Sequence, residues 1–308
     1  MFYIYLDQRD LINLAEGRDE ALKIRLYQEI AASHIQIVLS LMHVVETWKY
    51  ADTQAKQNLA AYADSISPIW LLFRSALFRE EMLRAFFLFR GEKVATLIEE
   101  SHTKVCACYP LSVGNHKTFS PFRKSVMETL SPSSTVRLSE AYDNSFAQML
   151  TLFEKDPRIV KMVAEVHDCY PDWSMDVKLK IIRELPGKSK WLLENARSAL
   201  RDLDIKDATI EQFVKSLDIT TCPSIYVYLR IKDAITKDKA PKPYPSEMVD
   251  IVHVSAIPYV DAFSTDKRIW DYVRRCKIYK QIFPEGYTRL ARAFKSLADI
   301  MSSIGANY

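Results

Sequence analysis

The feature that most constrains the fold is a short strand candidate near each end of the chain, followed in each case by an acidic residue. Near the start, Phe2–Leu6 (FYIYL) is apolar, aromatic and β-branched, and it stops at Asp7. Near the other end, residues 261–265 (DAFST) form a second short strand candidate, followed by Asp266. Runs as apolar as FYIYL are typical of strands buried on both faces, as in parallel sheets covered by helices.

Strand and helix patterns alternate after the first of these runs. We expect a helical turn over residues 10–15 and a helix from Asp19, as N-cap, to about Ala32. A second buried strand over His34–Ser40 (HIQIVLS) and a helix capped by Ser40 should follow. Such alternation predicts parallel strands joined by helical crossovers.

The same alternation returns at the end of the chain. Its expected elements are a helix over Ser246–Ile257, the strand over 261–265, a helix over Lys267–Cys276, a strand over Lys277–Phe283 and a final helix over Glu285–Ile304. Residues 1–50 and 246–308 are therefore predicted to form one α/β domain with a parallel sheet flanked by helices.

Residues 51–245 differ from both ends because their long segments have helical periodicity. The one strand candidate there is a weak one, Ser224–Leu229 (SIYVYL), and Lys237–Pro245 is a basic, proline-rich linker. Only six glycines occur in 308 residues, which favours helices. We predict that this segment is a large all-helical insertion, of unassigned function, between the two halves of the sheet.

Composition limits where such a chain can work. The net charge of +3 does not by itself indicate nucleic-acid binding, and five irregularly spaced cysteines argue against a secreted disulfide framework. The first residues have no basic leader. The most apolar stretch, Trp70–Phe89, contains five charged residues and is not expected to span a membrane. We therefore expect a soluble, cytoplasmic protein with no membrane partner.

Four acidic residues are predicted to meet at one edge of the sheet. Asp7 and Asp266 each follow a strand, while Glu46 and Asp250 lie on the helices that frame the same edge. Ligands of open parallel sheets bind beyond the carboxyl ends of the strands. Four converging carboxylates repel one another unless cations neutralise them, and Mg²⁺ or Mn²⁺ does so with oxygen ligands. Two such metals can support phosphodiester cleavage.

The segments YLDQRDLINLA, LMHVVETW and MVDIVHVSAIPYVDAFSTDKRI resemble the signature blocks of the PIN-domain superfamily of metal-dependent ribonucleases. Asp7, Glu46, Asp250 and Asp266 occupy the family's acidic positions, and Thr265 precedes the last of them. The resemblance covers about 110 residues at the two ends. It implies an endoribonuclease in which these four residues bind Mg²⁺ or Mn²⁺ and a metal-activated water attacks the phosphorus. Many members are toxins or defence effectors, which implies a protein regulator or antitoxin as a partner.

Two other functions fit the same pattern. The fold also serves structure-specific DNA nucleases, and metal ligands alone do not distinguish RNA from DNA. A catalytically inactive PIN-like protein would instead bind or scaffold a partner. In that case Asp7 and Asp266 would only cap the helices that follow them, and Glu46 and Asp250 would be exposed helix positions.

Several neighbours are candidate auxiliary residues. His253 lies one helical turn after Asp250, and His43 has the same relation to Glu46, although a structural role is favoured for both histidines. Asp10 fits an outer-sphere water contact and a helix N-cap equally well. Asp261 begins the strand that Asp266 follows, about 16 Å away, and is predicted to be structural.

Basic residues near the last acid are candidate nucleic-acid contacts. Lys267 and Arg268 open the helix after Asp266, where cations oppose the helix dipole. Arg274 and Arg275 end the same helix.

Three other signals are weak. A zinc site at Cys106, Cys108 and His116 lacks a fourth ligand, and no phosphate-binding glycine loop occurs. Arginines at four positions in the apolar stretch are expected to be solvated rather than to form a basic ridge: Arg74, Arg79, Arg84 and Arg90.

Overall fold

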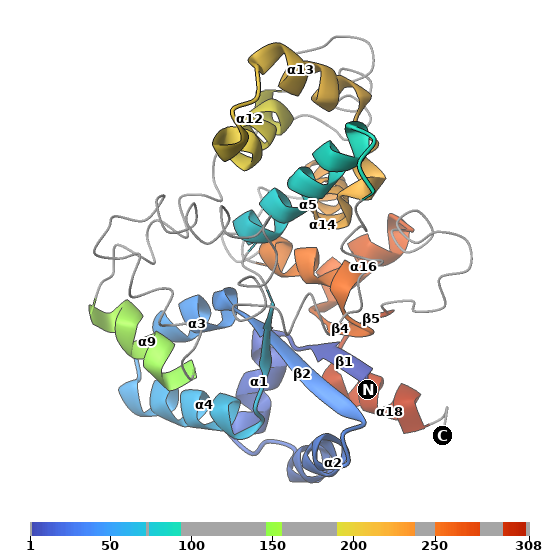
Figure 1. The fold of residues 1–308 in the computed structure, drawn as a ribbon. Helices are drawn as coiled ribbons and strands as arrows, with labels where there is room; N and C mark the ends of the chain where they lie inside the picture. Colours follow the sequence, from blue (N-terminus) through green and yellow to red (C-terminus); the bar gives the residue numbers. More distant parts are fainter. Residues whose placement is uncertain are drawn as a thin grey trace.

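The computed structural model describes residues 2–71, 74–93, 146–155, 190–237, 250–277 and 292–305. Within them lies a five-stranded, all-parallel sheet in the order β3-β2-β1-β4-β5 (Figure 1). Its strands are β1 (Phe2–Tyr5), β2 (Ile35–Ser40), β3 (Ile69–Leu71), β4 (Ala262–Ser264) and β5 (Arg292–Phe294). The predicted α/β class, with a parallel sheet flanked by helices and drawn from both ends of the chain, is confirmed.

β1 lies at the centre of the sheet because it pairs with strands from both ends of the chain. Its Tyr5 lies opposite Val38 of β2 on one side and opposite Phe263 of β4 on the other. Ile4, Tyr5 and Leu6 are almost completely buried, as their unbroken apolar character predicts. Parallel pairing places the carboxyl ends of all five strands at one edge of the sheet.

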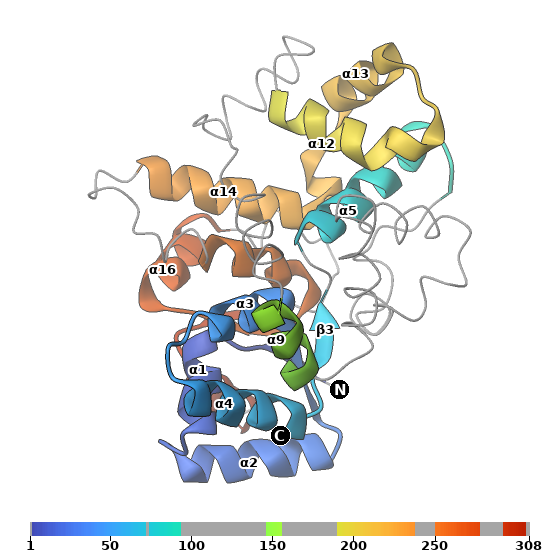
Figure 2. The same cartoon turned by 90° about the vertical axis from the view of Figure 1, so that its left-hand side faces the viewer.

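Helices surround the sheet and form a separate group beyond it. The helices beside the sheet are α1 (Gln8–Ala15), α2 (Glu20–Ala31), α3 (Leu41–Trp48), α4 (Thr53–Ser65), α9 (Phe146–Lys155), α16 (Lys267–Arg275) and α18 (Leu297–Gly305). The second group is α5 (Arg74–Phe89), α12 (Lys190–Leu200), α13 (Asp207–Ser216) and α14 (Pro223–Lys237), which we call the helical lobe. Two 3-10 turns connect its members, Arg201–Leu203 and Ile219–Thr221. Figure 2 shows α14 and α16 between the lobe's outer helices and the sheet.

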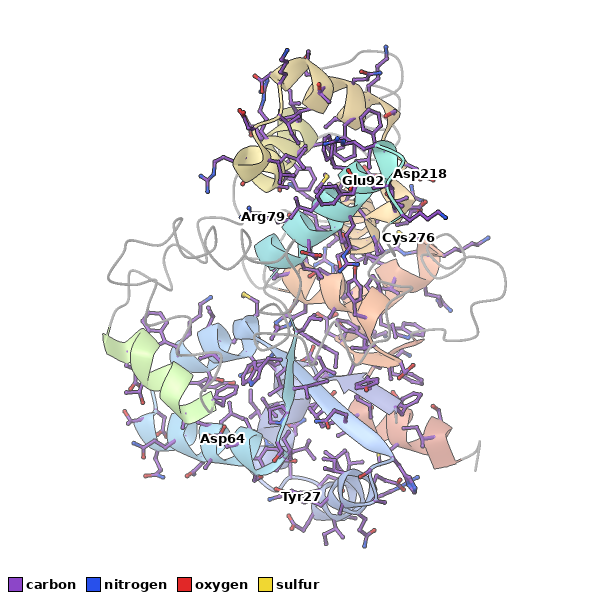
Figure 3. All side chains as sticks on the ribbon, in the orientation of Figure 1. Tyr27, Asp64, Arg79, Glu92, Asp218 and Cys276 are labelled. Atoms are coloured by element: carbon purple, nitrogen blue, oxygen red, sulfur yellow. The ribbon has the colours of Figure 1, made fainter. Side chains whose placement is uncertain are left out.

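Two helices begin against a carboxylate from a different helix. Asp64 of α4 accepts hydrogen bonds from the backbone amides of Phe146 and Ala147, at 2.6 and 3.2 Å, and so caps α9 (Figure 3). Glu81 of α5 accepts from the amides of Ser224 and Ile225 at the start of α14. The first amides of a helix have no partner within it, so these carboxylates satisfy groups that would otherwise be buried unpaired.

The strand predicted at Ser224–Leu229 is wrong, because these residues lie in α14. Ile225, Val227, Tyr228 and Leu229 are all buried. A helix buried on every side lacks the polar alternation that distinguishes it from a buried strand. The cap from Glu81, which is remote in sequence, also favours the helix.

The all-helical character predicted for residues 51–245 is also wrong at one point. Residues 69–71 form β3, whose Leu71 pairs with Ser40 of β2. The sheet therefore continues beyond residue 50, and α4 packs against α1 beside it. The stretch predicted as one helical segment, Trp70–Phe89, divides into the end of β3 and helix α5, which starts at Arg74.

The final helix predicted over Glu285–Ile304 is confirmed from Leu297 onward and is wrong over residues 292–296. Residues 292–294 form the edge strand β5, and helix α18 starts only at Leu297. The helix predicted over Ser246–Ile257 is helical at Asp250–His253 and then continues as a 3-10 helix, Val254–Tyr259, that contains Pro258.

Other predictions lie outside the described residues. They are the cap at Ser246, the strand after Lys277, the linker after Lys237, and the cysteine and histidine group at Cys106, Cys108 and His116. Of the described cysteines, neither Cys222 nor Cys276 forms a disulfide bond. None of the described helices has the length and apolarity needed to cross a membrane.

Arg79 and Arg84 of α5 depart from both sequence interpretations, whereas Arg90 is exposed, as expected. Arg79 (labelled in Figure 3) and Arg84 are 8% and 6% exposed, so neither is solvated and neither belongs to a surface ridge. Arg84 Nε lies 2.7 Å from Glu80 Oε1, one helical turn earlier. The arginine is therefore buried together with a carboxylate, which is how charge is tolerated inside a protein.

Candidate active site

Two of the four predicted acids lie at the carboxyl edge of the sheet. Asp7 follows β1 and Asp266 follows the neighbouring strand β4. The amide of Asp7 donates to the Ser264 hydroxyl at 2.7 Å, which ties the ends of the two strands together. The structure therefore brings together two residues that are 259 positions apart in the sequence.

Both acids also cap helices. Asp7 Oδ1 accepts from the amide of Arg9 at 2.8 Å, and Asp266 Oδ1 accepts from the amide of Ile269 at 2.8 Å. The capping role that sequence offered as an alternative is therefore real for both residues. Each cap uses one carboxylate oxygen, so the second oxygen of each group remains available for another ligand.

Asp250 shares its electrostatic environment with the other three acids. Burial and the charges of Asp266, Asp7 and Glu46 raise its pKa to about 7, although His253 acts in the opposite direction. Within the described part of the chain its carboxyl has no hydrogen-bond donor. A half-buried carboxyl among three others, with no donor to satisfy it, is an energetically costly arrangement.

Glu46 is paired with His253. His253 Nε2 lies 3.0 Å from Glu46 Oε2, and both side chains are largely buried. Burial raises the pKa of Glu46, but His253 and His43 more than offset this, so the pKa lies below its ordinary value. Burial lowers the pKa of His253, and the carboxylates of Glu46, Asp7 and Asp250 reverse the effect and raise it. These directions describe an imidazolium–carboxylate pair.

Behind this pair runs a buried chain of hydrogen bonds. The Tyr5 hydroxyl lies 2.5 Å from His253 Nδ1 and 2.6 Å from Ser40 Oγ. A protonated His253 donates from both ring nitrogens, so Tyr5 accepts from it and donates to Ser40. Sequence analysis did not single out Tyr5. Its position two residues before Asp7, on the same face of the strand, was the available signal.

His43 has the structural role that was favoured for it. Its Nε2 lies 2.7 Å from the carbonyl oxygen of Leu6, which only accepts, and its Nδ1 accepts from the amide of Ser40 at 3.0 Å. Burial lowers its pKa to about 4, and the charged His253 ring adds to this. His43 is therefore the neutral member of the histidine pair, whose ring centroids are 4.9 Å apart.

Three further predicted residues link neighbouring elements through hydrogen bonds. Asp10 accepts from the amide of Leu297 at 3.1 Å, and burial raises its pKa. Thr265 is buried, and its amide donates to the carbonyl of Phe294 at 3.0 Å. Asp261 Oδ2 accepts from the amide of Tyr3 at 2.8 Å, at the opposite end of the strands from Asp7. Asp261 is thus structural, as expected.

The four predicted basic contacts all lie on α16 but at different distances from the acids. Lys267 is exposed and Arg268 half-buried in the first turn, beside Asp266. Arg274 and Arg275 are in the last turn, about 12–14 Å further along the axis. The structure therefore places only the first two next to the carboxylates.

The described residues do not form a ready-made metal centre. No group of three or more His, Cys, Asp or Glu side chains within them is positioned to hold a metal ion. Comparisons with protein-family models, with curated proteins and with solved structures gave no match. The chemistry of the site must therefore be argued from its own residues.

Proposed function

We propose that this chain is a PIN-type, metal-dependent endoribonuclease that uses Asp7, Glu46, Asp250 and Asp266. The observation that carries the proposal is the placement of the acids: Asp7 and Asp266 follow the neighbouring parallel strands β1 and β4. In support, burial and the charges of Asp266, Asp7 and Glu46 raise the pKa of Asp250 to about 7. Such a concentration of negative charge stabilises a bound cation and is costly without one. Its place beyond the carboxyl ends of parallel strands is where ligands of such sheets bind.

The donor set fits a hard divalent cation such as Mg²⁺ or Mn²⁺. All four groups offer carboxylate oxygens, and Asp250 has no donor in the described part of the chain that a cation would displace. Asp7 and Asp266 each keep one oxygen beyond their capping bond. A cation held there would supply a Lewis acid for the oxygens of a phosphodiester.

The protein's own residues orient the ligands. His253 holds Glu46 by a 3.0 Å hydrogen bond and is itself held by Tyr5. The capping bonds fix Asp7 and Asp266 at the starts of α1 and α16. These supports keep the carboxylates from turning away from one another, which their mutual repulsion would otherwise favour.

The test is cleavage of matched RNA and DNA oligonucleotides with Mg²⁺, with Mn²⁺ and with EDTA. Asp7→Asn and Asp266→Asn should lose metal-dependent cleavage, because asparagine keeps the cap but removes the charge. Asp52→Asn is the matched control, since Asp52 caps α4 through the amides of Gln54 and Ala55, away from the cluster. Undiminished cleavage by both site variants, or equal loss in the control, contradicts the assignment. Cleavage of DNA in place of RNA would identify the DNA nuclease of the same fold.

A second candidate is a binding protein that has lost catalysis. The Glu46–His253 pair favours it, because an imidazolium beside Glu46 already neutralises one of the four acids. Calorimetry with Mn²⁺ separates the two candidates. Binding that Asp250→Asn abolishes supports the nuclease, and the absence of binding supports the scaffold.

A further inference from the structure

A cationic surface lies at the end of β5 and extends along α16, away from its cap Asp266. It consists of Arg9, Trp270, Arg274 and Lys295, and we call it the indole surface. Lys295 Nζ lies 4.4 Å and the Arg274 guanidinium carbon 4.9 Å from the centre of the Trp270 ring. Each distance is within the range of a cation–π interaction.

Backbone contacts fix this surface to the sheet edge. Trp270 Nε1 donates to the carbonyl of Ala293 at 3.0 Å, and Arg9 Nη2 donates to the carbonyl of Lys295 at 2.7 Å. The backbone amide of Arg9 also donates a hydrogen bond to Asp7 Oδ1. The indole surface therefore begins in the same helical turn that Asp7 caps.

The positive charge here is weakly compensated. Arg274 contacts Asp271 at 3.3 Å, but both side chains are exposed, so the pair contributes little. Within the described residues no carboxylate lies within ion-pair distance of Lys295. The charge of Arg9 acts on Asp7 and Asp10, whose pKa values it lowers against the effect of burial, without a close ion pair. Two cations held around one ring repel each other, and a bound polyanion relieves that repulsion.

We propose that the indole surface binds the phosphodiester backbone of the nucleic acid that enters the carboxylate cluster, and that Trp270 stacks on a base. The assignment rests on the proposed function, since it names how that site's substrate is held. Cations interleaved with an aromatic ring are the usual means of holding a nucleic-acid strand without reading its sequence. From Asp266 to Arg274 the helix rises about 12 Å, or about three nucleotides at 3.4 Å each.

The test measures binding without cleavage. A 12-nucleotide fluorescent RNA, as a single strand and as a duplex, is titrated with the full chain in EDTA at several salt concentrations, and anisotropy is recorded. The double variant Lys295→Ala/Arg274→Ala should bind the single strand about 25-fold more weakly at 0.1 M salt. Its salt slope should fall by about 1.4, because each lost phosphate contact removes about 0.7.

Two further variants keep the result interpretable. Lys215→Ala, at an exposed lysine of α13 in the helical lobe, is the matched control and should change affinity less than about two-fold. Trp270→Leu should weaken single-strand binding about ten-fold through lost stacking. Thermal unfolding of each variant confirms that it is folded.

An unchanged salt slope in the double variant, or an equal loss in Lys215→Ala, overturns the proposal. Equally tight binding of poly-glutamate of matched charge also overturns it. Asp266→Asn should leave binding in EDTA intact while cleavage is lost. If the wild-type chain binds as expected and never cleaves, the proposed function fails and the indole surface stands.

Discussion

Two buried carboxyl groups, Glu81 in the helical lobe and Asp250 at the sheet edge, have pKa values of about 7 for different reasons. Burial alone raises the pKa of Glu81, and three donors oppose it: the amides of Ser224 and Ile225 and the Tyr259 hydroxyl. At Asp250, neighbouring carboxylates add to burial, and no donor in the described part of the chain opposes them. A buried carboxyl with donors holds the elements around it together, whereas a carboxyl without donors among like charges is the kind of group that a bound cation would stabilise.

The largest expected effect on stability follows removal of the Glu81 carboxyl group. Glu81→Ala leaves the first amides of α14 and the Tyr259 hydroxyl unpaired in the interior, which should lower the free energy of unfolding by about 3–5 kcal/mol. Urea denaturation measures it. Glu81→Gln, which keeps an acceptor, should cost clearly less. An equal loss in both variants would mean that charge, rather than the acceptor, holds α14.

Asp250→Asn should have the opposite effect on stability. It removes one of four repelling charges, so stability in EDTA at pH 8 should rise by about 1–2 kcal/mol. Metal-dependent cleavage should fall by about 100- to 1000-fold, because a cation ligand is lost. Denaturation and cleavage measurements on the same variant check the gain in stability and the loss of cleavage. A destabilised Asp250→Asn protein would remove the contrast with Glu81.

The pH dependence of stability distinguishes the two groups. A carboxyl whose pKa rises from 4.5 to about 7 on folding binds more protons in the folded state between these values. The free energy of unfolding therefore falls by about 2–3 kcal/mol as pH rises through that interval and levels off above it. Saturating Mg²⁺ should abolish the part of this pH-dependent fall that is due to Asp250 and leave the part that is due to Glu81. Denaturation of Glu81→Gln and Asp250→Asn at pH 5 and pH 8 separates the contributions of the two groups to the pH dependence of stability.

The smallest effect is expected from loss of the Tyr5 hydroxyl, which contacts His253. Tyr5→Phe removes the hydroxyl between Ser40 and His253 and should cost about 1–2 kcal/mol of stability. Cleavage should fall about ten-fold, less than in Asp250→Asn, because Tyr5 orients His253 and does not contact a cation. Unchanged cleavage, with the stability cost observed, would show that the Glu46–His253 pair needs no support.

The sheet-edge region could largely be predicted from sequence, because its signals are local. FYIYL is too apolar for an exposed strand, and Asp7 and Asp266 stand where a strand ends and a helix needs a cap. The parallel direction of the strands was expected from the alternation of strands and helices, whereas the pairing of β1 with β4 is shown only by the structure. The hydrogen bond between Glu46 and His253 could not be predicted, because it depends on the relative rotation of two helices.

The helical lobe was harder to predict because its signals are tertiary. Four of the six residues of SIYVYL favour strands, and only burial on all sides and the remote cap from Glu81 make it a helix. β3 and β5 are three residues each, which is too short to show a period of two. Arg79 and Arg84 were expected to be solvated, and sequence contains nothing that pairs buried charges with each other.

The central place of β1 has a consequence for biosynthesis. Asp7 and Glu46 emerge from the ribosome early, whereas Asp250 and Asp266 follow more than two hundred residues later. At about 5–20 residues per second, the nascent chain carries half of the cluster for at least about 10 s. The strand that brings the other half, β4, pairs with β1 only after that delay. If the chain is the proposed nuclease, its site stays incomplete until the segment that carries Asp250 and Asp266 has been synthesised.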